Sequence, residues 1–233
     1  MVTLPDITLK DVDLDNLPRL KELRRLSFAR RPEICIERAR HITKYLRYMD
    51  DPKDSPEIRQ ARKVSHFLSR KAAVFPDKNL LAGTTTSKPL GAPLFPEFFS
   101  LSLWPELETV STREKNPQML TPEEARELNL AVFPYWMDKS VLEVARTRFD
   151  NPACIKLFES LVFFIAGKAG CISHAVPTYV PMLEKGLLGL IDEAALCETR
   201  AGDDDDPISP QQANFYRALQ ISLKGIIAYA DHL

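Results

Sequence analysis

The chain has 233 residues, a length typical of one large domain or of one and a half ordinary ones. Apolar residues make up 45% and charged residues 27%, and the formal net charge is −1 at pH 7. This composition supports a buried core and gives no reason to expect nucleic acid or an anionic membrane as a partner. Eight glycines against eighteen prolines indicate a chain divided by helix stops rather than by flexible linkers.

The cysteines and the N-terminal segment bear on the cellular compartment. Cys35, Cys154, Cys171 and Cys197 form no CxxC pair, which argues against a zinc ribbon or a thioredoxin-like motif. The acidic N-terminal sequence lacks the apolar core of a signal peptide, and the longest apolar run, 161–167, is far too short to span a bilayer. We therefore expect a cytoplasmic protein with reduced thiols.

Most of the chain has the apolar periodicity of helices. The sequence NLPRLKELRRLSFARR shows it up to Pro32, and EICIERARHITKYLRYM repeats it from Ile34 onward. Ser55 before Pro56 and the pair Thr121 and Glu124, three residues apart, are typical of helix N-termini. Further helices are predicted over 140–149, 152–169, 180–200 and 210–233.

Two stretches are predicted to be non-helical. Residues 77–117 are rich in Pro, Gly and Thr but also carry large apolar side chains, which indicates an ordered, partly extended loop rather than a solvated linker. Residues 201–210 form an acidic connector, and the run from Asp203 to Asp206 favours a solvated loop over a metal site. The chain has no internal repeat.

Three features invite a functional interpretation. His174, in SHAVPTY, is either a histidine hydrogen-bonded in a turn or a ligand contact or general acid/base. Glu97 stands among apolar residues in GAPLFPEFF, and a structural ion pair with Lys88 or an arginine is favoured over a carboxylate tuned for chemistry. The aromatic cluster of FPYWMDKS favours a core plug over a ligand platform; it comprises Phe133, Tyr135 and Trp136.

Four blocks taken together carry a family resemblance. RPEICIERARHITKYLR resembles P..C.ERA...T..Y, and NLLAGTTTSKPLGAPLFPEF resembles ELIVG....K....PIFPEF. VFPYWMDKSVLE is similar to PYW.GK, and SHAVPTYVPMLEKGLLGLIDEA to GH..P.Y..VL..GL.GI..EA. They occur in the order found in the N-terminal region of glycyl radical enzymes, the pyruvate formate-lyase and glycerol dehydratase family. The resemblance covers about residues 17–231 and resides in the set of four, since each block alone is weak.

The resemblance implies a fold. Complete members of the family have a ten-stranded α/β barrel, and their N-terminal part is mainly helices that wrap it. We therefore expect residues 1–233 to be a partial N-terminal pyruvate formate-lyase-type domain, mainly α with little strand. Its apolar stripes would normally cover the barrel.

The resemblance also implies an anaerobic radical mechanism. A backbone radical stored on a glycine takes a hydrogen atom from a cysteine thiol, and the thiyl radical then takes one from the substrate. An activase that uses an iron–sulfur cluster and S-adenosylmethionine installs the glycyl radical. The partners implied are the rest of the barrel, this activase, a small-molecule substrate and, in some members, a second copy of the chain; no cofactor is expected on this chain itself.

This sequence departs from the family pattern. Asp138 stands for the usual Gly before Lys139, and Ser173 for the Gly that often precedes the histidine, which suggests a subgroup with its own substrate. Neither the radical glycine motif nor the catalytic cysteine motif occurs, and Gly225 lies inside an apparent helix. No catalytic residue is therefore assigned in this chain.

A third interpretation, an unrelated helical scaffold, would require the match of the four blocks to be accidental. If the resemblance holds, two functions remain open at this stage. One is an N-terminal fragment or subunit of a radical lyase, of the dehydratase, decarboxylase or formate acetyltransferase type, inactive alone and acting on a small oxygenated substrate. The alternative is a non-catalytic binding or assembly module that pairs with a glycyl radical enzyme or its activase. In the dehydratase-like subgroup a histidine at the SHAVPTY position can hold a substrate hydroxyl, so the resemblance makes His174 the candidate substrate-binding residue.

Overall fold

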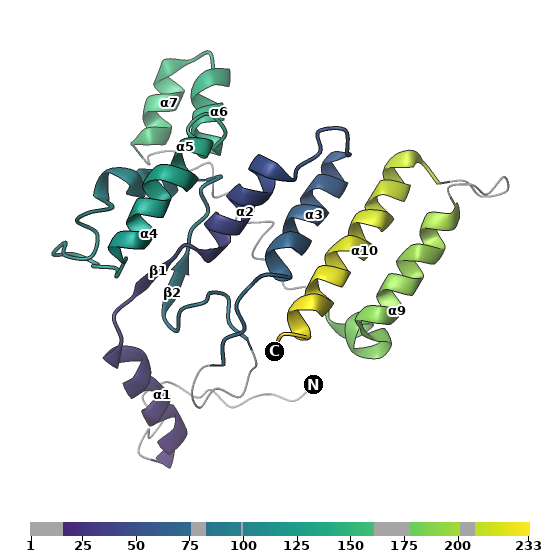
Figure 1. The fold of residues 1–233 in the computed structure, drawn as a ribbon, viewed down its shortest axis with the longest axis horizontal. Helices are drawn as coiled ribbons and strands as arrows, with labels where there is room; N and C mark the ends of the chain where they lie inside the picture. The colour runs from purple at the N-terminus through teal and green to yellow at the C-terminus, as the bar shows by residue number, and fades with distance from the viewer. Residues whose placement is uncertain (1–15, 76–82, 99, 161–177, 201–207) are drawn as a thin grey trace, which may run out of the picture.

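The computed structural model describes residues 16–75, 83–98, 100–160, 178–200 and 208–233. These residues are mainly helical, with two short strands, as the sequence predicts (Figure 1). Within them, no helix is both long enough and apolar enough to cross a membrane. The acidic run from Asp203 to Asp206 lies outside the described residues.

The elements follow one another in chain order with the labels of Figure 1. They are α1 (Pro18–Ala29), β1 (Glu33–Cys35), α2 (Glu37–Tyr48), α3 (Pro56–Leu68), β2 (Gly91–Pro93), the 3-10 helix η3 (Ser100–Glu106), α4 (Pro122–Glu127), the π-helical turn η4 (Leu128–Val132), α5 (Phe133–Trp136), α6 (Val141–Arg148), α7 (Pro152–Glu159), α9 (Val180–Thr199) and α10 (Pro210–Ala230).

The prediction of one helical stretch from Ile34 onward was wrong at its start. Residues 33–35 form β1, which pairs in parallel with β2 so that Ile34 lies opposite Ala92. On its other side, the backbone N–H of Ile34 donates to the carbonyl of Met119, at 2.9 Å. Because the backbone groups of this segment are hydrogen-bonded to two distant segments, it is extended, and the helix begins only at Glu37.

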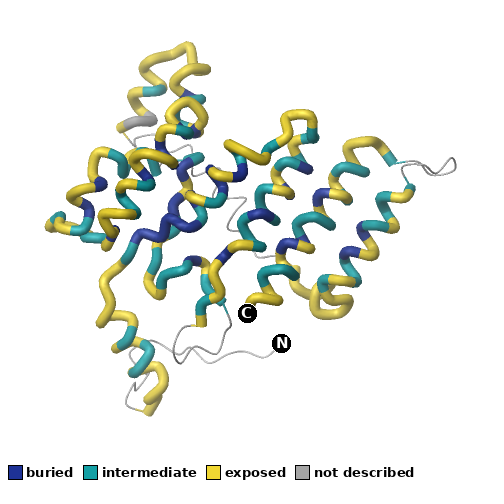
Figure 2. The backbone as a smooth tube through the Cα atoms, in the orientation of Figure 1, coloured by how far each residue is buried: buried dark blue, intermediate teal, exposed yellow. Residues whose placement is uncertain are grey.

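The largest core cluster surrounds β1 and α2. Figure 2 shows the buried backbone gathered there, whereas α1 and α7 are mostly exposed. Phe133 and Trp136 belong to this cluster, so the prediction of an aromatic core plug is confirmed. The indole N–H of Trp136 donates to the hydroxyl of Thr43 at 2.8 Å, which satisfies its one buried polar atom.

Four helices pack in the order α2, α3, α10 and α9 (Figure 1). Ile58 and Ala61 of α3 pack against Ala218 of α10. The two helices approach closely at Gly225, where an added Cβ would lie 2.6 Å from the Cα of Ser65. The absence of a side chain at this position therefore sets the spacing of the two helices.

The two predicted helix starts are confirmed. The hydroxyl of Ser55 accepts from the N–H of Ile58 at 3.4 Å. Thr121 and Glu124 form a capping box, in which each side chain accepts a hydrogen bond from the other residue's N–H. Both contacts satisfy donors that the first turn of a helix leaves free.

We predict that Gly225→Ala destabilises the protein by about 1–3 kcal/mol, because the new methyl group would overlap the backbone of α3. The measurement is the free energy of unfolding in urea. Gly189→Ala in α9 is the matched control, since its Cβ would meet only the Cβ of Lys185, at 3.1 Å. This control should change stability by less than about 1 kcal/mol. Equal effects of the two substitutions would contradict the close-contact explanation.

Candidate functional site

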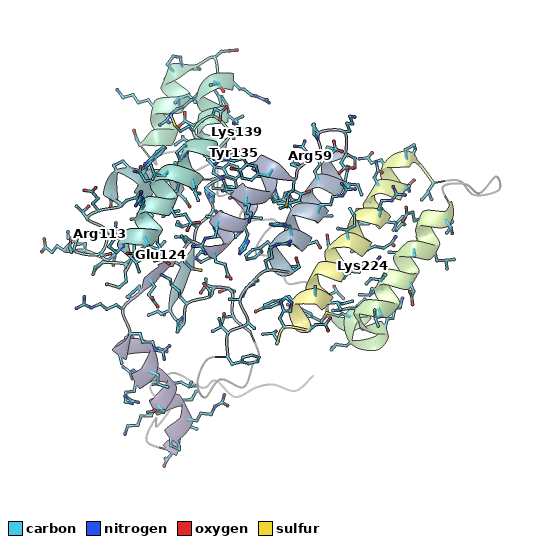
Figure 3. The ribbon with its side chains drawn as sticks, in the orientation of Figure 1. Arg59, Arg113, Glu124, Tyr135, Lys139 and Lys224 are labelled. Atoms are coloured by element: carbon cyan, nitrogen blue, oxygen red, sulfur yellow. The ribbon has the colours of Figure 1, made fainter. Side chains whose placement is uncertain are left out.

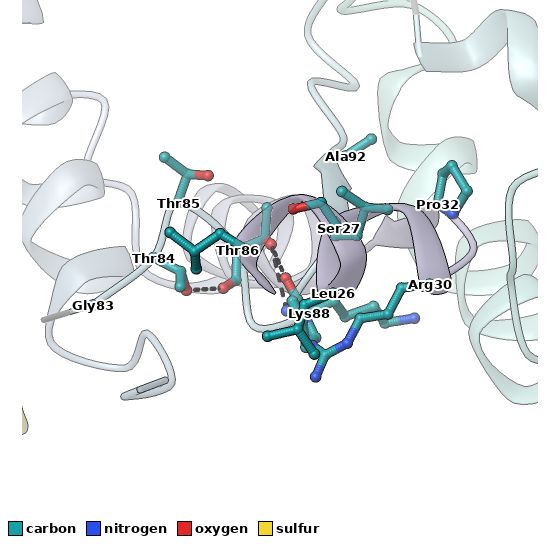
Figure 4. Close-up of a pocket in the computed structure, with 14 residues that line it drawn as sticks. Leu26, Ser27, Arg30, Pro32, Gly83, Thr84, Thr85, Thr86, Lys88 and Ala92 are labelled. Atoms are coloured by element: carbon teal, nitrogen blue, oxygen red, sulfur yellow. Dashed lines mark hydrogen bonds between the residues drawn. The ribbon is translucent and has the colours of Figure 1, made fainter. Parts of the chain in front are cut away.

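A cavity of about 750 Å³ lies between α1 and residues 83–92. Figure 4 shows Ser27, which belongs to α1, and Arg30, which follows the end of that helix, together with Thr84 and Thr85 of the other segment. Leucine side chains complete the apolar part of the wall. The volume is in the range of small-molecule sites in proteins.

Internal bonds occupy much of the polar lining. The hydroxyl of Thr84 donates to the backbone carbonyl of Thr86. The hydroxyl of Thr86 in turn donates to the backbone carbonyl of Lys88, at 2.7 Å. The ammonium of Lys88 is paired with Glu124 at 2.8 Å. Arg30, in contrast, makes no hydrogen bond or ion pair with another described residue. Its guanidinium is therefore available to an anionic or oxygenated ligand.

Among the described residues that line the cavity there is no Asp, Glu, His or Cys, so this part of the lining offers neither a carboxylate or imidazole base nor a thiol. Nor does the described part of the chain contain a cluster of three or more His, Cys, Asp or Glu that could hold a metal ion. None of the cavity residues was predicted as a site from the sequence.

Glu97 is a structural carboxylate in the described fold. It forms a two-pronged ion pair with Arg38, in which one guanidinium nitrogen donates to its Oε2 at 3.1 Å. The guanidinium lies 4.1 Å from the centre of the Phe95 ring, and the backbone carbonyl of Glu97 accepts from the N–H of Val141 at 2.8 Å. The predicted pairing with an arginine is thus confirmed, whereas Lys88 pairs elsewhere.

We predict that Glu97→Gln lowers the free energy of unfolding by about 1–3 kcal/mol, because it leaves the half-buried guanidinium of Arg38 without its counter-charge. Thermal or urea unfolding measures the change. Glu106→Gln, which breaks the more exposed pair with Arg113, is the matched control and should cost less than about 1 kcal/mol. If Glu97→Gln left the free energy of unfolding unchanged, the pair would have no structural role.

Two histidines that the sequence did not single out meet between α2 and α3. The rings of His41 and His66 are 6.2 Å apart, and Tyr45 lies 5.3 Å from His66. His41 Nδ1 and His66 Nε2 are buried and have no hydrogen-bond partner in the described part of the chain. Burial lowers the pKa of His66 to about 4, and the charges of Arg70 and neighbouring groups act in the same direction.

We predict that His66 makes the fold acid-sensitive. Its pKa is about 6.5 in the unfolded chain and about 4 in the fold, so the unfolded chain binds more protons between these values. The free energy of unfolding should therefore fall as the pH is lowered from about 6.5 to about 4, by roughly 1–2 kcal/mol from this group. When the free energy of unfolding is plotted against pH over this range, the slope should be shallower for His66→Gln than for the unsubstituted chain.

His232→Gln, at an exposed position near the C-terminus, is the control for that slope. It should leave the pH dependence unchanged. If His66→Gln and the unsubstituted chain had the same slope, protonation of His66 would not be the cause of the acid sensitivity.

The sequence-predicted candidates are distributed as follows. His174, and Cys171 close to it, lie outside the described residues, so the substrate-contact prediction stays a prediction. Tyr135 is half-buried beside the core, with the ammonium of Lys139 5.0 Å from its ring (Figure 3). Gly225 lies inside α10, as predicted.

Comparison with known proteins identifies the family. The model of the family described as pyruvate formate lyase-like matches residues 12–233. The chain belongs to this family. The resemblance inferred from the four sequence blocks is therefore confirmed.

Similar proteins of the pyruvate formate lyase-like family are much longer than this chain. The probable dehydratase YbiW of Escherichia coli K12 is 26% identical over 166 residues, which are 71% of this chain and 20% of that protein. The (2S)-3-sulfopropanediol dehydratase of Klebsiella oxytoca is 24% identical over 226 residues, 93% of this chain and 26% of that enzyme. This chain thus spans about a quarter or less of both relatives.

The fold agrees with a solved member. A crystal structure of a glycyl radical enzyme from Archaeoglobus fulgidus superposes with a TM-score of 0.73 at 23% identity. The match covers 91% of this chain and 26% of that enzyme. The helical arrangement described above is therefore one that a glycyl radical enzyme contains.

Proposed function

We propose that this chain is the N-terminal region of a glycyl radical lyase or dehydratase. The observation that carries the proposal is the family match over residues 12–233, together with the short share of each relative that the chain spans. In this proposal the chain supplies helices that enclose a barrel contributed by further sequence, in the same polypeptide or a separate one. Alone, the 233 residues would be inactive.

The substrate we propose is a small oxygenated organic molecule. One relative is named as a dehydratase of a sulfonated propanediol and another as a probable dehydratase. His174 is the proposed substrate contact, since a neutral imidazole can hold a substrate hydroxyl and still pass a proton near neutral pH. The glycyl radical and the thiyl cysteine would lie outside this chain. A separate activase in the cytoplasm would install the radical.

We expect His174→Ala in the complete enzyme to raise KM by roughly ten-fold or more, because a buried substrate hydroxyl would lose its hydrogen-bond partner. Steady-state kinetics under anaerobic conditions measures this effect. The glycyl radical signal in electron paramagnetic resonance should be unchanged, which separates substrate binding from activation. An unchanged KM for each substrate turned over would remove His174 from the site.

The mass of the native gene product, isolated anaerobically from the source cells, tests the larger proposal. A polypeptide much longer than 233 residues, or a companion chain that copurifies and restores radical formation, supports it. A product ending at Leu233 that copurifies only with an intact glycyl radical enzyme or activase would instead favour the assembly module.

A further inference from the structure

Helix α9 changes direction at Gly186. The backbone there has φ 68° and ψ 174°, although the helical hydrogen bonding continues on either side. A side chain disfavours this combination strongly, so that glycine is almost the only residue to adopt it. An added Cβ would meet nothing within 4 Å, so glycine is needed here for its backbone angles and not for space.

The residues before the bend form an apolar arm, defined here as 178–185. Every residue of the arm is exposed. Its large apolar side chains include Tyr179 at 53% exposure and Leu183 at 79%. Beyond the bend, Ile191 and Ala194 are buried. Packing within the described chain therefore fixes the second part of α9 but not the arm.

An ion pair spans the bend. The ammonium of Lys185 lies 2.6 Å from a carboxylate oxygen of Glu193. In a straight helix, residues eight apart lie about 12 Å from each other along the axis and about 80° apart around it. The bend at Gly186 accounts for the pairing of two residues that a straight α9 would present on different sides.

We propose that Gly186 is a positioning residue, whose backbone conformation aims the apolar arm at the rest of the enzyme. The proposal rests on the proposed function, since the partner is the barrel. Four large apolar side chains within five residues, all exposed, are typical of a surface that another part of a protein covers. They are Tyr179, Val180, Met182 and Leu183. Only 20% and 26% of the lengths of two relatives align with this chain, so most of the sequence of each relative lies outside the match and could supply such a partner.

The bend itself is tested on the 233-residue chain. A carbodiimide joins an ammonium and a carboxylate directly only where they are in contact, and mass spectrometry identifies the joined peptides. The Lys185–Glu193 cross-link should form in the unsubstituted chain and in Gly189→Ala, and should fall at least five-fold in Gly186→Ala. An undiminished cross-link in Gly186→Ala would overturn the positioning role.

The docking of the arm is tested on the complete enzyme by hydrogen–deuterium exchange. Amides of residues 178–185 should exchange at least ten-fold more slowly there than in the 233-residue chain. Gly186→Ala should lose much of this protection, whereas Gly189→Ala should keep it. Equal exchange in the complete enzyme and in the 233-residue chain would overturn the docking. Protection that appears in the 233-residue chain as its concentration rises would also overturn it, because the partner would then be a second copy of the chain. If the native product proves to have no barrel, the proposed function fails, while the cross-link still reports on Gly186.

Discussion

The extended strand β1 is the constraint on which the rest of the fold depends. Its residues Ile34 and Cys35 are each 1% exposed, and its backbone is held on one side by residues 90–94 and on the other by Met119. One short strand therefore brings together three stretches separated by dozens of residues. Because α2 begins directly after it, the position of the strand also fixes where α2 meets the core.

Polar contacts reinforce this arrangement where the distant segments meet. Arg38, at the start of α2, reaches Glu97 beyond β2, and Lys88 before β2 reaches Glu124 in α4. Trp136 reaches back to Thr43 in α2. Each contact joins elements that the strand pairing has already brought close, so it adds specificity to the packing without setting the topology. The half-burial of the Arg38 and Lys88 pairs makes them stronger than pairs in open solvent.

The sequence predicted what local interactions determine. Ser55 and Thr121 act within their own first turns, so their residue types sufficed to place two helix starts. The strand at Ile34 was missed because its hydrogen-bond partners lie in residues 90–94 and 119, which no local pattern reveals. The pairing of Glu97 was predictable in kind, since a carboxylate among apolar residues needs a cation, but the choice of Arg38 depends on the tertiary fold. The backbone angles of Gly186 were likewise invisible, because glycine inside a helical pattern is also compatible with a straight helix.

The polar side chains of the described core serve packing and ion pairing rather than catalysis. His41 and His66 meet by the packing of α2 against α3, and burial lowers the pKa of both. A general acid or base must exchange protons with a substrate, whereas His66 is only 8% exposed and lies beside Tyr45. The carboxylate of Glu97 is occupied by Arg38. What the described chain does offer are surfaces, in the cavity beside Arg30 and the arm before Gly186. In the proposed function, the rest of the enzyme covers the exposed apolar arm, and the substrate chemistry is then to be sought where that arm docks.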